Sequence, residues 1–285
     1  MQLLNRFNIR DSRFWLLTIA GLVTALNFSL IEYSSIYLLF WYGALAITWR
    51  RRDRLAFDSD LFSTSCGLLI ISWLIFRGVV SDRNLDLIVR MYPIFSIVGI
   101  YLLASKINRL KQYWRELIIV GLTGIPWEHI SSIFLSTSQI SVLDAKISRL
   151  ILWYFGFDVT QANNLVILPT GTIQIAGACS SFDLLGLMWQ CCLVIYLYFA
   201  IRKSQLLLLW VYSSLIALVV NGLRLCLMAL LVANQQQSAF DYWHGSAGAE
   251  IFSTIALLLL ALVFWLLIIR NREVLREAQS ITDNQ

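Results

Sequence analysis

The stretch Gly177-Ala178-Cys179-Ser180-Ser181-Phe182 ends a polar segment and opens a long apolar run. Two later motifs belong with it: Asn221-Gly222-Leu223-Arg224 lies inside another apolar run, and His244-Gly245 lies just before the last one. A thiol, a guanidinium and an imidazole can together supply a nucleophile, a charge stabiliser and a general acid/base. They make a catalytic site only if the chain brings them to one face of one membrane.

The composition indicates a membrane protein. Of the 285 residues, 59% are hydrophobic and only 14% are charged, whereas soluble domains carry about 25% charged residues. We therefore expect an all-α polytopic integral membrane protein with a single transmembrane domain over residues 1–285. The net charge of +5 comes from short basic clusters between apolar runs, which is typical of the positive-inside rule and not of nucleic-acid binding.

The five cysteines form an odd set without a CxxC pair, which argues against a disulfide framework or a zinc site. Four of them fall inside apolar runs, where cysteine behaves as a small hydrophobe. These four are Cys66, Cys191, Cys192 and Cys226. Cys179 differs from them because it lies where a polar segment meets an apolar run.

The apolar runs predict about eight transmembrane helices. The predicted spans cover residues 14–31, 36–48, 61–80, 87–104, 117–135, 182–201, 206–233 and 249–269. The densest basic cluster, Arg50-Arg51-Arg52-Asp53-Arg54, follows the second span and favours a cytoplasmic location for that loop. With eight spans, both termini are then cytoplasmic, and the segment from Thr137 to Ala178 is extracytoplasmic.

This extracytoplasmic segment predicts a helix in the membrane interface and then a short hairpin. Apolar residues recur at helical spacing with charged residues between them, which is typical of an interfacial helix. The apolar positions are Leu143, Ile147, Leu150, Ile151 and Tyr154, and the charged ones are Asp144, Lys146 and Arg149. Pro169-Thr170-Gly171 separates two short strand-like runs at residues 165–168 and 172–176, which indicates a hairpin leading to Cys179.

This topology brings the three reactive side chains to one face. Cys179 lies at the outer start of the sixth span and His244 just outside the eighth. Arg224 lies nine residues from the outer end of the seventh span, so we expect it roughly 13 Å deep, with a stem long enough to reach back toward the surface. With Ser180 and Ser181 as caps, the helix N-terminus and a nearby cation would lower the pKa of the Cys179 thiol.

Each of these residues also has a structural interpretation. Cys179 could pack as a small residue between helices, Arg224 could snorkel or bind a backbone carbonyl, and His244 could belong to an aromatic belt at the surface. Asn221, one turn before Arg224, could orient it. Glu128-His129 could support the site or form a polar packing pair, or His129 could bind haem together with His244.

The three motifs resemble those of the exosortase/archaeosortase family of integral membrane cysteine transpeptidases. Ala178-Cys179-Ser180-Ser181 corresponds to the family's Ala-Cys-Ser-Gly motif, with Ser181 in place of the usual glycine. Asn221-Gly222-Leu223-Arg224 corresponds to its Asn-x-x-Arg motif, and His244 to its later histidine at the membrane edge. The resemblance covers about residues 143–266, the expected catalytic core, and the earlier spans match only in hydropathy.

The resemblance implies a thiol protease and transpeptidase that sorts secreted proteins at the extracytoplasmic face of a bacterial inner membrane. Its substrates would carry a C-terminal tail with a PEP-CTERM-like motif, a transmembrane helix and a basic cluster. Cys179 would attack the peptide carbonyl, Arg224 would stabilise the oxyanion and His244 would act as acid and base, supported by Asn221 and Ser180. The chemistry requires no metal or cofactor.

The alternative from the sequence is a non-enzymatic membrane protein. It would be a transporter or a membrane subunit of a polysaccharide export system, with membrane lipid as its main surroundings. The interior of the predicted spans is poor in acidic residues, and no inverted repeat is evident, which argues against a transporter.

Overall fold

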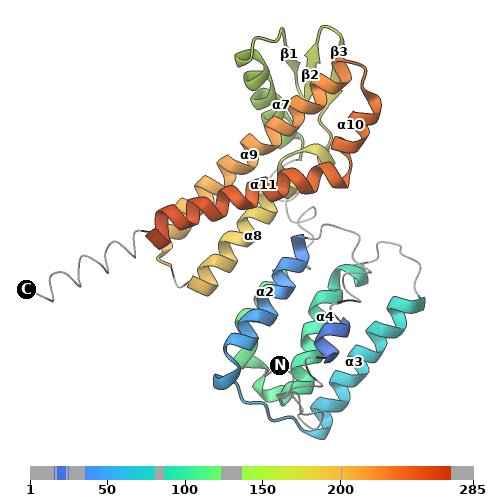
Figure 1. The fold of residues 1–285 in the computed structure, drawn as a ribbon, viewed down its shortest axis with the longest axis vertical. Coiled ribbons are helices and arrows are strands. Elements are labelled where there is room, and N and C mark those ends of the chain that lie inside the picture. Colours follow the sequence, from blue (N-terminus) through green and yellow to red (C-terminus); the bar gives the residue numbers. More distant parts are fainter. Residues whose placement is uncertain are drawn as a thin grey trace, which may run out of the picture. The chain divides into compact units, whose positions relative to one another are not determined.

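The computed structural model describes residues 16, 18–23, 25, 36–80, 87–122, 137–199 and 201–270 (Figure 1). The chain forms two compact units, Met1–Ile125 and Pro126–Gln285. The expected catalytic core, residues 143–266, lies wholly in the second unit. Whether the chain acts as the single transmembrane domain expected from the sequence stays a prediction.

The described part of the first unit is helical. Its elements are α2 (Ile36–Arg50), η2 (Arg52–Arg54), α3 (Leu61–Val80), α4 (Leu87–Ala104), η3 (Ile107–Tyr113) and α5 (Trp114–Gly121). Helix α3 packs against α4, and α2 against α5. Gly67 and Gly99 allow a close approach, because a Cβ added at Gly67 would lie 2.8 Å from the Gly99 carbonyl oxygen. The helices predicted at residues 36–48, 61–80 and 87–104 are confirmed.

A buried polar cluster fixes the basic loop of this unit. The Tyr101 and Tyr113 rings stack with their centroids 3.9 Å apart, and the Tyr101 hydroxyl hydrogen-bonds Thr48 at 2.6 Å. Arg51 donates to the fully buried Glu116 carboxylate at 2.7 Å. A buried carboxylate needs a cationic or hydrogen-bonding partner. Arg51 of the densest basic cluster is this partner for Glu116.

The second unit is built around one long helix. Its elements are α7 (Thr137–Tyr154), β1 (Thr160–Ala162), β2 (Leu165–Leu168), β3 (Gly171–Gln174), η5 (Gly177–Cys179), α8 (Phe182–Phe199), α9 (Lys203–Ala233), α10 (Gln237–His244), α11 (Ser246–Phe264) and the π-helical η6 (Trp265–Ile269). Helices α8, α9 and α11 lie side by side (Figure 1). Helix α7, the strands and α10 gather around the C-terminal half of α9.

The predicted hairpin is part of a larger sheet. Strands β2 and β3 form it, with Val166 opposite Ile173, but β1 pairs with β2 and completes an antiparallel sheet of order β1-β2-β3. The sequence analysis missed β1 because Thr160–Ala162 is short and carries no apolar alternation. Asn163, with φ of 51°, makes the turn between β1 and β2.

Strand β3 begins directly against the end of α9. A Cβ added at Gly171 would lie 2.9 Å from the backbone nitrogen of Ala233. Glycine therefore allows the sheet to pack on the helix backbone, which fixes the segment that leads to Cys179.

The helix predicted around residues 143–154 is confirmed as α7, but its surroundings differ from the expectation. Ile147 and Ile151 pack against Gly222 of α9, so protein and not lipid covers this face. Leu150 and Tyr154 are exposed, whereas Asp144, expected on the polar side, is fully buried.

Four of the described helical segments are long and apolar enough to cross a membrane. They are Leu61–Gly78, Phe182–Phe199, Lys203–Ala233 and Ser246–Ile269. A fifth results if Met91–Ala104 and Ile107–Gly121, which bend by 119° at their break, form one span. The chain is a multi-pass membrane protein, but the eight predicted spans are not confirmed. Residues 26–31 and 123–135 of two of them lie outside the described residues.

Helix α9 is longer than a membrane is thick. Its 31 residues extend about 46 Å, against a hydrocarbon core of about 30 Å. Asn221 of α9 contacts Cys179, three residues before α8 begins, and Arg224 contacts His244, two residues before α11 begins. Residues 203–221 of α9 therefore lie beside α8 and α11 and extend about 28 Å along the helix axis. Residues 222–233 project about 18 Å past the first residues of α8 and α11.

The depth of Arg224 in a membrane stays a prediction, but its level relative to the neighbouring helices is defined. Arg224 lies level with the first residues of α8 and α11. Most of the apolar residues beyond it pack against α7, the sheet and α10. Leu225, Cys226, Met228 and Ala229 are all buried in this core.

We predict that the partly exposed Leu227, in the projecting segment, is accessible to water, whereas the exposed Leu215 is covered by lipid. In a protein without native cysteines, Leu227→Cys should react with a charged maleimide in permeabilised cells, and Leu215→Cys should react only after detergent is added. Equal protection of both positions would place the whole of α9 inside the bilayer.

Candidate active site

Cys179 ends the short helical turn η5 and is almost completely buried. Its N–H donates to the Ala176 carbonyl at 3.0 Å, and the Ser180 N–H donates to the Gly177 carbonyl at 3.1 Å. The Ser180 hydroxyl donates to the same Gly177 carbonyl at 2.7 Å. Ser180, expected as a helix cap, thus mainly closes the turn that carries the thiol.

His244 is the last residue of α10, a helix that the sequence analysis did not predict. Its Nδ1 lies 3.3 Å from the Cys179 Sγ, within hydrogen-bonding distance for sulfur. The Phe240 ring stacks on the imidazole with centroids 5.3 Å apart and an interplanar angle of 11°. One turn of α10 therefore fixes both the position and the plane of the imidazole.

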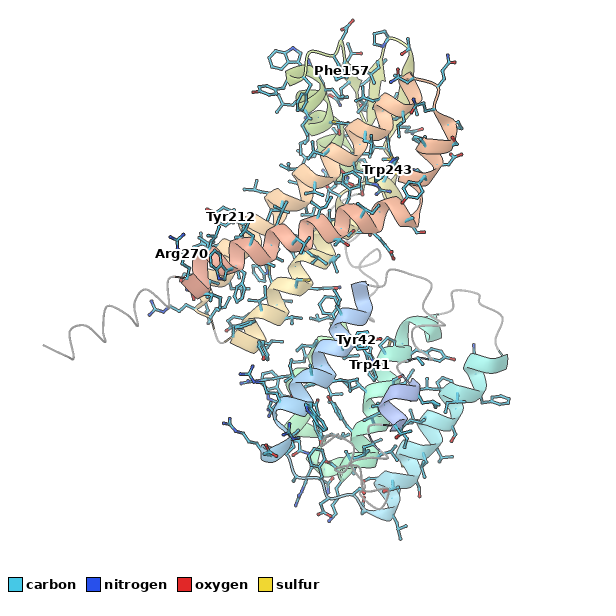
Figure 2. All side chains as sticks on the ribbon, viewed as in Figure 1. Trp41, Tyr42, Phe157, Tyr212, Trp243 and Arg270 are labelled. Atoms are coloured by element: carbon cyan, nitrogen blue, oxygen red, sulfur yellow. The ribbon has the colours of Figure 1, made fainter. Side chains whose placement is uncertain are left out.

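Arg224 holds the end of α10. Its Nε donates to the Trp243 carbonyl at 3.2 Å, and a terminal nitrogen donates to the His244 carbonyl at 2.9 Å. Carbonyls at a helix C-terminus lack partners within the helix, so an arginine satisfies them well. The alternative in which Arg224 binds backbone carbonyls is thus confirmed. Figure 2 shows Trp243, whose carbonyl Arg224 binds, at the end of α11 opposite to Arg270.

Asn221, expected to orient Arg224, contacts the segment that carries Cys179. Its Nδ2 donates to the Cys179 carbonyl oxygen at 3.1 Å. Both Asn221 and Arg224 are buried and lie on one face of α9, three residues apart. A single helical turn therefore contacts the segments that carry Cys179 and His244.

The electrostatics of the thiol differ from the prediction. Burial raises the pKa of the Cys179 thiol, and the Arg224 charge opposes this rise. The expected lowering of the thiol pKa is wrong because Cys179 precedes α8 and lies in the protein interior, where the loss of water outweighs the nearby cation. The cation itself is present, as predicted.

One residue beside the site, Asp144, was not recognised from the sequence as part of it. The Asp144 carboxylate accepts hydrogen bonds from both the N–H and the hydroxyl of Ser181, each at 2.7 Å. Asp144 is spaced four residues from Ile140 and three from Ile147, which places it on the packed face of α7. This spacing is the signal that could have identified it.

The other histidine cannot be placed. Glu128 and His129, considered as supporting residues or as haem ligands, lie outside the described residues.

The fold and the site define a multi-pass membrane protein with a buried thiol–imidazole pair at the level where two spans begin. A family model described as transmembrane exosortase (Exosortase_EpsH) matches residues 29–272. The chain therefore belongs to the transmembrane exosortase family. No curated protein and no solved structure matches it. This membership implies the processing of proteins with PEP-CTERM tails and favours an enzyme over a transporter or export subunit.

The charge of Arg224 predicts a change in thiol reactivity. Because Arg224 lowers the pKa of the Cys179 thiol, Arg224→Gln should raise it, and the pH at which alkylation by iodoacetamide becomes fast should move upward. Arg224→Lys, which keeps a charge, should shift it less. The measurement uses a protein whose only cysteine is Cys179. The exposed Lys146→Gln is the control, and an unchanged profile for Arg224→Gln would remove the electrostatic role.

Gly248 predicts a steric effect at the corner between α10 and α11. A Cβ added at Gly248 would lie 2.5 Å from the Cα of Trp243 and 2.6 Å from its carbonyl oxygen. Gly248→Ala should therefore displace the residue before His244 and cost about 1–3 kcal/mol of stability, measured as a lower unfolding temperature. Gly43→Ala, with nothing within 4 Å of the added Cβ, should not. Equal unfolding temperatures for both variants would mean that this corner adjusts freely.

Proposed function

We propose that this exosortase is a membrane-embedded thiol peptidase and transpeptidase that cleaves the C-terminal sorting tails of secreted proteins. The observation that carries the proposal is the 3.3 Å contact between the Cys179 Sγ and the His244 Nδ1. An imidazole at this distance can take the thiol proton and return it to a leaving group.

In the proposed first step, the neutral imidazole, protonated on Nε2, takes the Cys179 proton on Nδ1. The thiolate attacks the carbonyl carbon of the scissile peptide bond and gives a tetrahedral oxyanion. The C–N bond then breaks as the imidazolium of His244 gives a proton to the leaving amine, which leaves a thioester on Cys179. Attack by water or by an acceptor nucleophile, with His244 as base, releases the product and restores the thiol.

Arg224 is the proposed donor to the oxyanion. The N–H groups of Cys179 and Ser180 donate to carbonyls within their own turn, so this turn does not offer them to a substrate. A guanidinium has five N–H groups, and the contacts with Trp243 and His244 use two of its nitrogens. The remaining N–H groups suit a developing negative charge in a dry site.

The level of the site supports the proposed substrate class. Cys179 and His244 lie within three residues of the starts of α8 and α11. A substrate whose transmembrane helix lies beside these spans would bring the residues next to that helix to the same level. A sorting motif directly adjoining a membrane helix fits this arrangement, whereas a bond far from any membrane helix does not.

The proposed location of the site is the extracytoplasmic face of a bacterial inner membrane, with both termini cytoplasmic. The basic cluster around Arg51 supports this sidedness. In intact cells, an impermeant maleimide should label Leu227→Cys and not Arg51→Cys, and the reverse pattern would overturn it.

The mechanism predicts the behaviour of variants at the three positions. Cys179→Ala should abolish cleavage of a tail-bearing reporter, and Arg224→Lys and His244→Ala should each slow it by roughly 100-fold or more. Lysine fails because it cannot hold two carbonyls and an oxyanion with the geometry of a planar fork. Cleavage is measured per enzyme molecule in the membrane.

Two comparisons control this experiment. Joint replacement of Cys66, Cys191, Cys192 and Cys226 should leave much of the activity, because none of them contributes to the proposed chemistry. Combining Cys179→Ala with His244→Ala should add little loss, since residues that act as a unit are not additive. Full cleavage by Cys179→Ala would eliminate the thiol mechanism, and near-normal cleavage by Arg224→Ala would leave that arginine a structural role only.

A further inference from the structure

Asp144 is a buried carboxylate on a helix whose other nearby charges are exposed. Its exposed fraction is 0%, whereas Lys146 and Arg149 of the same helix face solvent. Burying a charge is costly unless several donors compensate it. Asp144 therefore needs hydrogen-bond donors from other segments of the second unit.

The donors come from the segment that carries the nucleophile. The N–H of Ser181 donates to Oδ2 of Asp144 and its hydroxyl to Oδ1, both at 2.7 Å. Ser181 immediately precedes α8, and its carbonyl accepts the Leu185 N–H at 2.8 Å in the first turn. A carboxylate at this place also interacts favourably with the helix N-terminus. Asp144 thus fixes the point where the turn of Cys179 becomes α8.

Asn221 holds the other side of the same turn. It donates to the Cys179 carbonyl at 3.1 Å. It also lies near the Asp144 carboxyl, whose pKa is raised by burial and lowered by Ser181 and Asn221. The turn is therefore held on both sides of Ser180, by Asp144 from α7 and by Asn221 from α9.

The two helices that supply these contacts are firmly packed together. Ile147 and Ile151 of α7 meet Gly222 of α9, and the Cys226 thiol donates to the Ser148 carbonyl at 3.4 Å. A change at Asp144 would therefore act on the turn and not on the separation of α7 and α9.

We propose that Asp144 is a positioning residue that, through Ser181, sets the backbone of the Cys179 turn and so holds the thiol in line with His244. This inference rests on the proposed function and adds to it a residue that touches neither the substrate nor the thiol. The thiol–imidazole distance is 3.3 Å, and a misplacement of about 1 Å in a reacting group can cost on the order of 100-fold in rate.

Ser181 makes the inference specific to this chain. The family motif implied by the resemblance has glycine at this position, which offers only the backbone N–H. Ser181→Gly removes the hydroxyl bond and keeps the N–H bond to Oδ2, so it should have a smaller effect than loss of the carboxylate.

The test compares Asp144→Ala, Asp144→Asn and Ser181→Gly with the exposed Asp158→Asn as the matched control. Asp144→Ala should lower kcat for reporter cleavage by about 10- to 100-fold with little change in KM. Asp144→Asn keeps the shape of the side chain but has a single acceptor oxygen, so its kcat should fall less. The kcat of Ser181→Gly and of the control Asp158→Asn should fall least. Should Asp144→Ala fail to fold, Asp144→Asn still supplies the comparison.

A second readout does not depend on the proposed function. In proteins whose only cysteine is Cys179, iodoacetamide alkylation at fixed pH should slow about tenfold when the thiol loses its alignment with the base, even if no reporter is cleaved. The same slowing should appear in His244→Ala, and adding Asp144→Asn to it should change little. A purely structural Asp144 would lower the protein level or unfolding temperature and leave alkylation per folded molecule unchanged.

The outcomes separate the two proposals. Normal cleavage and normal alkylation in well-folded Asp144→Ala and Asp144→Asn would overturn the positioning role while the proposed function stands. Absence of cleavage by the unmodified enzyme, with alkylation still slowed by the Asp144 variants, would overturn the proposed function and support the positioning of the thiol.

Discussion

One turn of α9, from Asn221 to Arg224, fixes the relative positions of the thiol and the imidazole. Asn221 binds the carbonyl of Cys179, and Arg224 binds the carbonyls of Trp243 and His244. Cys179 and His244 are 65 positions apart in the chain, yet both of their segments are held by side chains of the same helical turn. The distance between Sγ and Nδ1 therefore depends less on the loops that join these segments than on a helix that cannot bend within one turn.

The proximity of Cys179, Arg224 and His244 could be predicted from the sequence, whereas their supporting contacts could not. Motif spacing and hydropathy brought Cys179, Arg224 and His244 to one face, and the structure has the thiol and the imidazole in contact. Contacts with backbone carbonyls, such as those of Arg224, carry no sequence pattern because every residue has a carbonyl. Asp144 did have a signal in its spacing from Ile140, but charge alone suggested an exposed position.

Hydropathy also predicts most of the helices, but it does not determine where the membrane surface crosses each of them. Hydropathy identified α3, α8 and α11 closely, because each is an apolar run with polar ends. In α9 the apolar run continues past Asn221 into a segment whose side chains face α7, the sheet and α10. Burial in protein and burial in lipid select the same residue types, so sequence alone cannot locate the membrane surface along such a helix.

The burial of Cys179 has a chemical consequence for the resting protein. The residue is 5% exposed, and burial raises the pKa of its thiol, which favours the protonated form. Oxidation to sulfenic acid and exchange with disulfides both proceed through the thiolate. In the proposed mechanism, a sulfur kept as a thiol until a carbonyl is in place would be protected against peroxide and against mixed disulfides. Such a site would need no reducing partner at the proposed extracytoplasmic face.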